Sequence, residues 1–184
     1  MSATAITALV LLGAALSASA QPGERAVTAE AVVAAPVSEV WAAWTSSAGA
    51  RTFFAPDANI ELAIYGAYEL YFDPTAAPGN RGGEGNKVLA FQPEKMLTFS
   101  WNAPPSLPTV RDQRTFVVVR FEAIDAQQTR VTLHHSGWGQ GGEWDKAFDY
   151  FNNAWNRFVM PLLKYRFAND PVDWNNLPDL STLK

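Results

Sequence analysis

The sequence predicts an α+β fold in which an antiparallel sheet of about seven strands packs against one long helix near the C-terminus. Two observations carry this prediction. Hydrophobic and polar residues alternate in several short runs between residues 59 and 135, which is the period of a half-buried strand. From Trp144 to Leu162 the hydrophobic residues recur at intervals of three and four, which is the period of an amphipathic helix.

Two or three elements precede the main run of strands. Residues Ala26–Ala34 alternate β-branched and small side chains and end before Pro36, so they predict a first strand. Pro36 suits the first turn of a helix, and the apolar residues that follow it have helical spacing. A second, short helix is expected over Ser46–Phe54, where Pro56 ends it.

Further strands follow one another, separated by turns rich in Gly, Pro and Asn. Short turns favour antiparallel pairing, so successive strands are expected to be neighbours. The predicted strands are Asn59–Ile64, Ala67–Phe72, Lys87–Phe91, Met96–Asn102, Phe116–Ala123 and Arg130–His135. The glycine-rich stretch Gly79–Gly85 precedes a strand and not a helix, so we expect a flexible hairpin tip there. Prolines predict an exposed loop over Ala103–Asp112.

The long helix has an almost continuously aromatic face, while acidic residues and asparagines occupy the opposite positions. This pattern predicts that the aromatic face lies against the sheet. Pro161 predicts a kink, or an end to regular helix within one or two turns. Residues Ala168–Lys184 are expected to form an extension that packs loosely through Trp174.

Residues 1–20 predict a secretory signal peptide. They carry no charged side chain, Ala5–Leu16 is almost wholly small or apolar, and Ala18 and Ala20 suit a signal peptidase. A helix of about twelve residues spans about 18 Å, too little for the roughly 30 Å hydrocarbon core. We therefore expect cleavage after Ala20, a periplasmic or secreted protein and no stable membrane insertion. The predicted parts are this signal peptide, one domain over residues 26–167 and the extension over 168–184.

Composition excludes several classes of function. The chain has 184 residues and a formal net charge of −4, so it offers no broad positive field, and nucleic acid is not expected as a partner. It has no cysteine, which excludes a disulfide scaffold, a thiol nucleophile, an iron–sulfur cluster and a zinc site with Cys ligands. No cofactor is expected.

Short motifs follow one another through most of the chain. They are Val40–Thr45, Arg51–Pro56, Gly66–Leu70, Val88–Leu97, Ser100–Trp101 and Thr129–Trp138. In this order and spacing they resemble the SRPBCC, or START-like, superfamily, in the branch related to the C-terminal domain of the heat-shock-protein-90 ATPase activator. The resemblance covers roughly residues 27–167. It implies a helix-grip fold, in which a curved sheet wraps around the last helix. The superfamily includes carriers of lipids and other hydrophobic ligands, polyketide cyclases and many members with no assigned activity, so the resemblance implies the fold more specifically than the function.

The helix-grip fold implies a space between the sheet and the long helix. Large side chains are expected to point into it from both layers, where they either fill the centre or line an apolar pocket. The sequence leaves both outcomes open. If a pocket exists, we expect a small hydrophobic or aromatic ligand there. Its expected contacts are Trp41, Phe91, Trp101, Val119, Phe121, Leu133, His135, Phe148, Phe151 and Trp155.

His135 is the only titratable residue expected to point inward from its strand, while His134 is expected to face solvent. It either hydrogen-bonds a ligand or is satisfied by Ser136 or a backbone group. No spacing of His with Cys or acidic residues indicates a metal site.

Three functions therefore remain. The first is an exported protein that binds a hydrophobic ligand. The second is a cyclase- or dehydratase-like enzyme with His135 as general acid or base. The third is a protein-interaction domain similar to chaperone activators, favoured by a filled interior or by an exposed apolar surface around Trp138 and Trp144. The sequence assigns no other catalytic residue, so an enzyme is the less favoured class, and it leaves the oligomeric state open.

Overall fold

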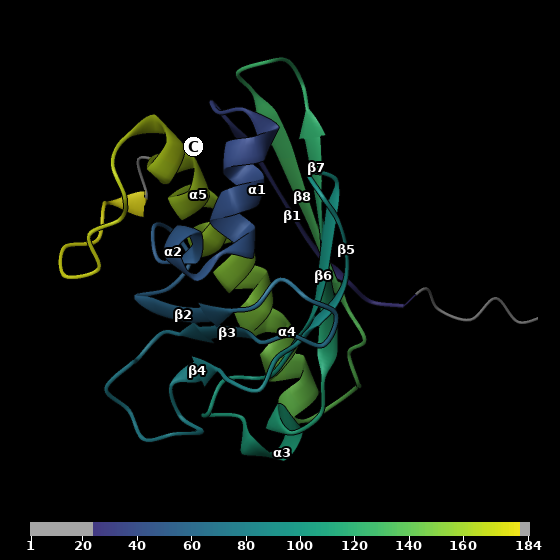
Figure 1. Cartoon of the computed structure of the whole chain (residues 1–184). Helices are drawn as coiled ribbons and strands as arrows, with labels where there is room; N and C mark the ends of the chain where they lie inside the picture. Colours follow the sequence, from purple (N-terminus) through teal and green to yellow (C-terminus); the bar gives the residue numbers. More distant parts are fainter. Residues whose placement is uncertain (1–23, 181–184) are drawn as a thin grey trace, which may run out of the picture.

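Two antiparallel sheets and a long, interrupted helix make up this computed structural model, which describes residues 24–180 (Figure 1). The predicted signal peptide and the last four residues of the predicted extension lie outside the described residues. The helices lie on one face of the larger sheet (Figure 1). This arrangement confirms the predicted α+β helix-grip fold.

The larger sheet has five strands in the order β1-β8-β7-β6-β5, and the smaller has the order β2-β3-β4. A single bridge between Ala67 and Lys87 connects them. The strands of the larger sheet are β1 (Val27–Val33), β5 (Val88–Gln92), β6 (Met96–Trp101), β7 (Thr115–Ala123) and β8 (Thr129–Ser136). Those of the smaller sheet are β2 (Asp57–Ile60), β3 (Tyr68–Tyr71) and β4 (Gly82–Gly83).

All seven predicted strands are present, with two differences. Strand β2 begins before the predicted Asn59 and ends at Ile60, and the glycine-rich stretch contains the short strand β4. Only glycine allows β3 and β4 to approach so closely at residue 82, because a Cβ atom there would lie 2.6 Å from the Phe72 ring. The backbone angle φ of Gly82 is +132°, a value that residues with a Cβ atom rarely adopt.

The helices are α1 (Val37–Thr45), α2 (Ser47–Ala50), α3 (Pro108–Arg111), α4 (Glu143–Ala154) and α5 (Met160–Ala168), with the π-helical segment η1 (Trp155–Val159) between the last two. The short α3 lies within the stretch predicted as a loop. The long helix continues past Pro161 and ends at Ala168, about two turns later, which is within the predicted limit. The interruption is η1, where the Met160 amide donates to the Trp155 carbonyl five residues back. This wider turn gives room to Pro161, which would clash in an uninterrupted α-helix.

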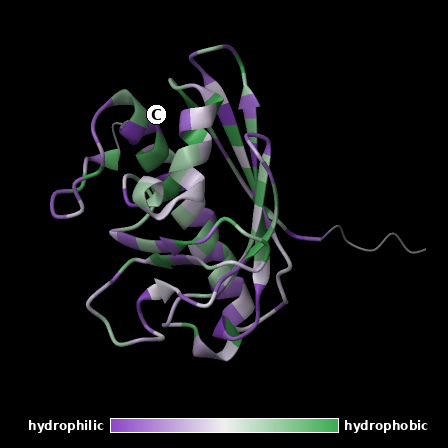
Figure 2. Cartoon of the chain, viewed as in Figure 1, coloured by the Kyte–Doolittle hydropathy of each residue, from purple (hydrophilic) through white to green (hydrophobic). Residues whose placement is uncertain are grey.

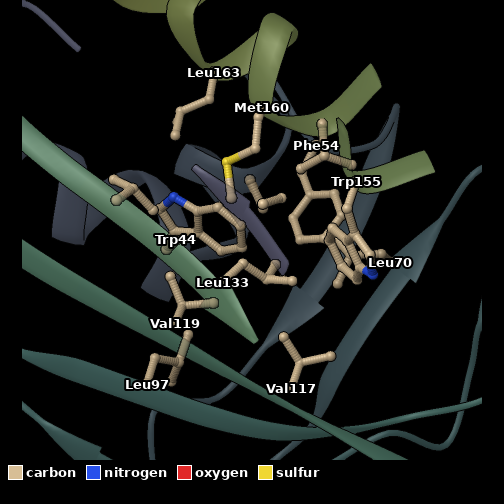
Figure 3. Close-up of a cluster of buried hydrophobic side chains, with 14 of the residues drawn as sticks. Trp44, Phe54, Leu70, Leu97, Val117, Val119, Leu133, Trp155, Met160 and Leu163 are labelled. Carbon is tan, nitrogen blue, oxygen red and sulfur yellow. The ribbon is translucent and has the colours of Figure 1, made fainter. Parts of the chain in front are cut away.

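The core forms between the inner face of the larger sheet and the helices. Inward side chains alternate along each strand, and Leu97, Val119 and Leu133 lie opposite one another across three strands. Figure 2 shows the matching alternation of hydrophilic and hydrophobic positions along the strands. In Figure 3, Val119 and Leu133 point from the sheet towards the rings of Trp44 and Trp155. Both tryptophans are almost fully buried.

Candidate functional site

An apolar groove of about 490 Å³ lies where the long helix meets the ends of β3 and β6 and the C-terminal extension. Its lining is almost entirely aromatic or aliphatic. The lining residues are Phe54, Phe72, Trp101, Tyr150, Phe151, Asn153, Ala154, Trp155, Phe158, Val159, Leu162, Trp174 and Leu177. A groove of this size and character matches typical small-molecule sites.

Several elements bring these side chains together. Phe54 follows α2, Phe72 follows β3, and Trp101 is the last residue of β6. These three rings contact one another, with centroids 6.0 Å apart for Phe54 and Trp101 and 6.5 Å for Phe72 and Trp101. The long helix supplies the other wall through Trp155, whose ring lies 5.7 Å from those of both Phe54 and Trp101.

Four large apolar or aromatic side chains on the groove remain accessible to water. Their exposed fractions are 46% for Phe72, 50% for Tyr150, 53% for Phe158 and 51% for Leu177. Single exposed hydrophobic residues are ordinary on protein surfaces, but several around one hollow form a patch that usually has a binding role.

The C-terminal extension closes one side of the groove. The Trp174 indole N–H donates to the carbonyl of Arg51 at 2.7 Å, and the Val172 amide donates to the carbonyl of Thr52 at 2.9 Å. Val172 is buried. These contacts attach the extension to residues 51 and 52, which lie about 120 residues earlier in the sequence. They place Trp174 and Leu177 beside the groove.

The groove brings together three of the ten predicted contacts, Trp101, Phe151 and Trp155. The other seven do not line it. Val119, Leu133 and His135 are buried core residues, and Trp41 and Phe121 contact each other edge to face at 5.3 Å. Phe148 packs on Trp138, and Phe91 is a partly buried residue at the edge of the core. These seven side chains pack within the core or against it, whereas the groove lies where the long helix meets the ends of β3 and β6.

His135 is fully buried and both of its ring nitrogens have partners. Nδ1 accepts from the Trp155 indole N–H at 2.9 Å, and Nε2 lies 2.7 Å from Thr115 Oγ1. Because the indole is only a donor, Nδ1 must be unprotonated, so Nε2 carries the proton and donates to Thr115. Burial, with a smaller effect of neighbouring His134, lowers the pKa of His135 to about 3. The ring is therefore neutral and structural in this geometry. Its partners are not the expected Ser136 or backbone groups.

Sequence reasoning missed most of the groove. The sequence patterns do not single out Phe54, Phe72 and Leu177, and they include Phe158 only as part of the hydrophobic repeat from Trp144 to Leu162. Their signal is weak because Phe54, Phe72 and Leu177 lie in turns or irregular segments, where periodicity assigns no face to a side chain, and Phe158 lies in the π-helical segment η1. The sequence does predict that the extension packs on the domain through Trp174. This is the sequence signal that connects the extension with the groove.

A second hollow, of about 410 Å³, lies on the outer face of the larger sheet and is lined by mainly polar residues, including Arg120, Thr132 and His134. Between residues 24 and 180, no group of three or more acidic or histidine side chains is arranged to hold a metal ion. Within that same range, no helix is both long enough and apolar enough to cross a membrane.

Comparison with known proteins finds a matching family and several solved structures with a similar fold. The family described as activator of Hsp90 ATPase homolog 1-like protein matches residues 34–165. This match confirms the branch that the sequence motifs resemble. No curated protein has a sequence that matches this chain significantly.

Solved structures share the fold at low sequence identity. CalU16 from Micromonospora echinospora has a TM-score of 0.58 and 21% identity, over 80% of this chain and 77% of that one. Protein NE0264 from Nitrosomonas europaea has a TM-score of 0.59 and 15% identity, over 82% and 98% of the two chains. An HSP90 activator from Plasmodium falciparum has a TM-score of 0.56 and 14% identity, over 75% and 91%.

Proposed function

The chain belongs to the activator of Hsp90 ATPase homolog 1-like family, and on that premise we propose that it binds a small hydrophobic molecule in the groove between the long helix, β3, β6 and the C-terminal extension. The observation that carries this proposal is the clustering of accessible aromatic rings around a hollow of about 490 Å³. A ligand there would contact Trp101, Phe151 and Trp155, which the sequence also indicated.

The free energy of binding would come from covering apolar surface. Water contacts the rings of Phe72 and Phe158 in the free protein, and removing apolar surface from water yields about 25 cal/mol per Å². The surrounding rings are already held by contacts with one another, so little ordering is required when the ligand enters. The site is therefore suited to a compact aromatic or alicyclic body.

The extension is a part of this site that lies outside the family match. The family match ends at residue 165, whereas Trp174 and Leu177 lie beyond it and line the groove. We propose that these two side chains adapt the groove to the ligand of this particular protein.

The two alternative functions have less support. An acid or base must reach its substrate, and His135 is enclosed with both nitrogens occupied. A chaperone-activator-like role is favoured by the filled interior but lacks the apolar surface expected around Trp138, which is buried against Trp144 and Phe148. Export of the protein, with cleavage after Ala20, remains part of the proposal and rests on the sequence of residues 1–20.

Titration with N-phenylnaphthylamine, a neutral probe whose fluorescence rises in apolar sites, tests the proposal. The wild-type protein should bind the probe saturably. Phe158→Ala should weaken binding about tenfold, because the lost ring surface corresponds to about 1–2 kcal/mol. Phe116→Ala removes a comparably exposed ring from β7, outside the groove, and should bind like wild type. Absence of saturable binding, or equal effects of both substitutions, would contradict the proposal.

A further inference from the structure

A small recess of about 120 Å³, whose lining is less apolar than that of the groove, adjoins the apolar groove. The two hollows share Phe72, Trp101, Tyr150 and Phe151, so they lie next to each other. The remaining wall of the recess includes polar side chains and the backbone of a glycine pair. These residues are Asp73, Asn80, Arg81, Gly82, Gly83 and Asn102, and the apolar residues Ala103, Pro104 and Pro105 complete the wall.

Tyr150 stands at the junction of the two hollows. Its ring packs edge to face on Phe151 at 5.0 Å, and half of its surface is exposed. Among residues 24–180, its hydroxyl has no hydrogen-bond partner. Partial burial raises the pKa of Tyr150, so the hydroxyl keeps its proton near neutral pH. It is therefore a free donor at the boundary between the apolar and the polar part.

Most other polar side chains of the recess are already engaged, whereas the Asn80 side-chain amide has no hydrogen-bond partner within residues 24–180. The Arg81 Nε donates to Glu84 Oε1 at 2.9 Å, and its guanidinium lies 4.4 Å from the centre of the Tyr71 ring. The Asn102 side chain accepts from Asn86 Nδ2 at 2.9 Å and donates to two carbonyls. Asp73 accepts from the amide and the hydroxyl of Thr75 and keeps its negative charge.

The charges of Asp73, Arg81 and Glu84 determine which polar group of a ligand the recess can accept. A carboxylate in the recess would face the Asp73 carboxylate, and Arg81 is already paired with Glu84. A neutral oxygen avoids this repulsion and can still accept a hydrogen bond.

We propose that the ligand is amphipathic, with an apolar body in the groove and a neutral carbonyl oxygen that accepts a hydrogen bond from Tyr150. This inference rests on the proposed function and narrows the ligand to ketones, esters or amides of hydrophobic compounds. Tyr150 would select among hydrophobic molecules by the oxygen they carry, and the groove would supply most of the affinity.

Calorimetric titration with a matched pair of probes tests the inference. One probe is methyl naphthyl ketone, and the other is isopropylnaphthalene, which has almost the same shape but no oxygen. Wild type should bind the ketone about threefold to tenfold more tightly than the hydrocarbon, the range expected for one hydrogen bond. Tyr150→Phe should abolish this difference and leave the affinity for the hydrocarbon unchanged. Tyr65→Phe, at an exposed tyrosine outside both hollows, should keep the difference.

The outcomes separate the two levels of the proposal. If neither probe binds wild type, the groove does not take small hydrophobic molecules and the proposed function fails. If both probes bind and Tyr150→Phe leaves the preference for the ketone intact, the groove is a ligand site but the role of Tyr150 is refuted. Tighter binding of naphthoate than of the ketone would refute the preference for a neutral oxygen.

Discussion

His135 lies near the end of β8, where Trp155 and Thr115 each bond one of its ring nitrogens. Its environment explains why an inward histidine need not be catalytic. Protonation would place a charge in a closed apolar core and would break the bond from the Trp155 indole N–H, since a protonated Nδ1 cannot accept it. The ring therefore links strand β7, strand β8 and segment η1 as a neutral group.

This geometry predicts a pH-dependent stability. The pKa of His135 is about 3 in the folded chain against 6.5 as the reference, so between these values the unfolded chain binds more protons. The stabilisation is present above the reference pKa and is lost progressively as the pH falls. From about pH 7 to about pH 5, the free energy of unfolding should fall by about 2 kcal/mol because of this group. Urea unfolding at several pH values measures the change.

Two substitutions at neighbouring histidines provide the comparison. His135→Gln can keep both hydrogen bonds but does not titrate, so it should remove most of this pH dependence. His134→Gln changes an exposed residue and should retain most of it. An unchanged pH dependence in His135→Gln would mean that other groups cause the acid destabilisation.

At the scale of elements, the π-helical segment η1 shapes the groove. One additional residue in its turn shifts the helix face by about 100°, the rotation of one helical residue. Trp155, Phe158 and Val159 all lie in η1 and line the groove, although Trp155 also reaches His135 in the core. The kink that Pro161 predicts thus corresponds to η1, and η1 lines the groove.

The C-terminal extension is the second element that shapes the groove. Trp174→Ala removes both a groove wall and the bond to the Arg51 carbonyl, so N-phenylnaphthylamine should bind about tenfold more weakly. Trp174→Phe keeps a ring but loses the indole N–H, and a smaller loss of about twofold to fivefold is expected. Fluorescence titration measures both, and wild-type affinity in Trp174→Ala would show that the extension does not contribute.

At the scale of the whole molecule, the remaining prediction is that residues 1–20 are a signal peptide that is removed during export. If residues 1–20 are a signal peptide, protein recovered from the producing cell's periplasm or medium should begin at Gln21 by intact mass. Ala20→Arg should block cleavage and leave the precursor, because the peptidase pocket takes small residues. Gln21→Asn lies beyond the expected cleavage site and should be processed normally. Detection of Ala5–Leu16 in the exported protein would contradict the prediction.

The sequence by itself determined the order of seven strands and of the main helices, and it indicated the family, because hydrophobic periodicity and motif spacing relate residues that are near in the chain; it did not predict β4 and α3. The alternation along β7 and β8 placed His135 inward and His134 outward, as the structure has them. The same reasoning found Trp101, Phe151 and Trp155 as inward aromatic residues.

Only the tertiary structure decided which rings fill the core and which line a hollow. Phe54, Phe72, Trp101, Trp155 and Trp174 come from five separate segments, and their distances depend on how helix, sheets and extension pack. The partners of His135 are each 20 residues away in the sequence, so no local pattern could identify them. Periodicity indicates the face on which a side chain lies, whereas the space in front of that face depends on every element that packs against it.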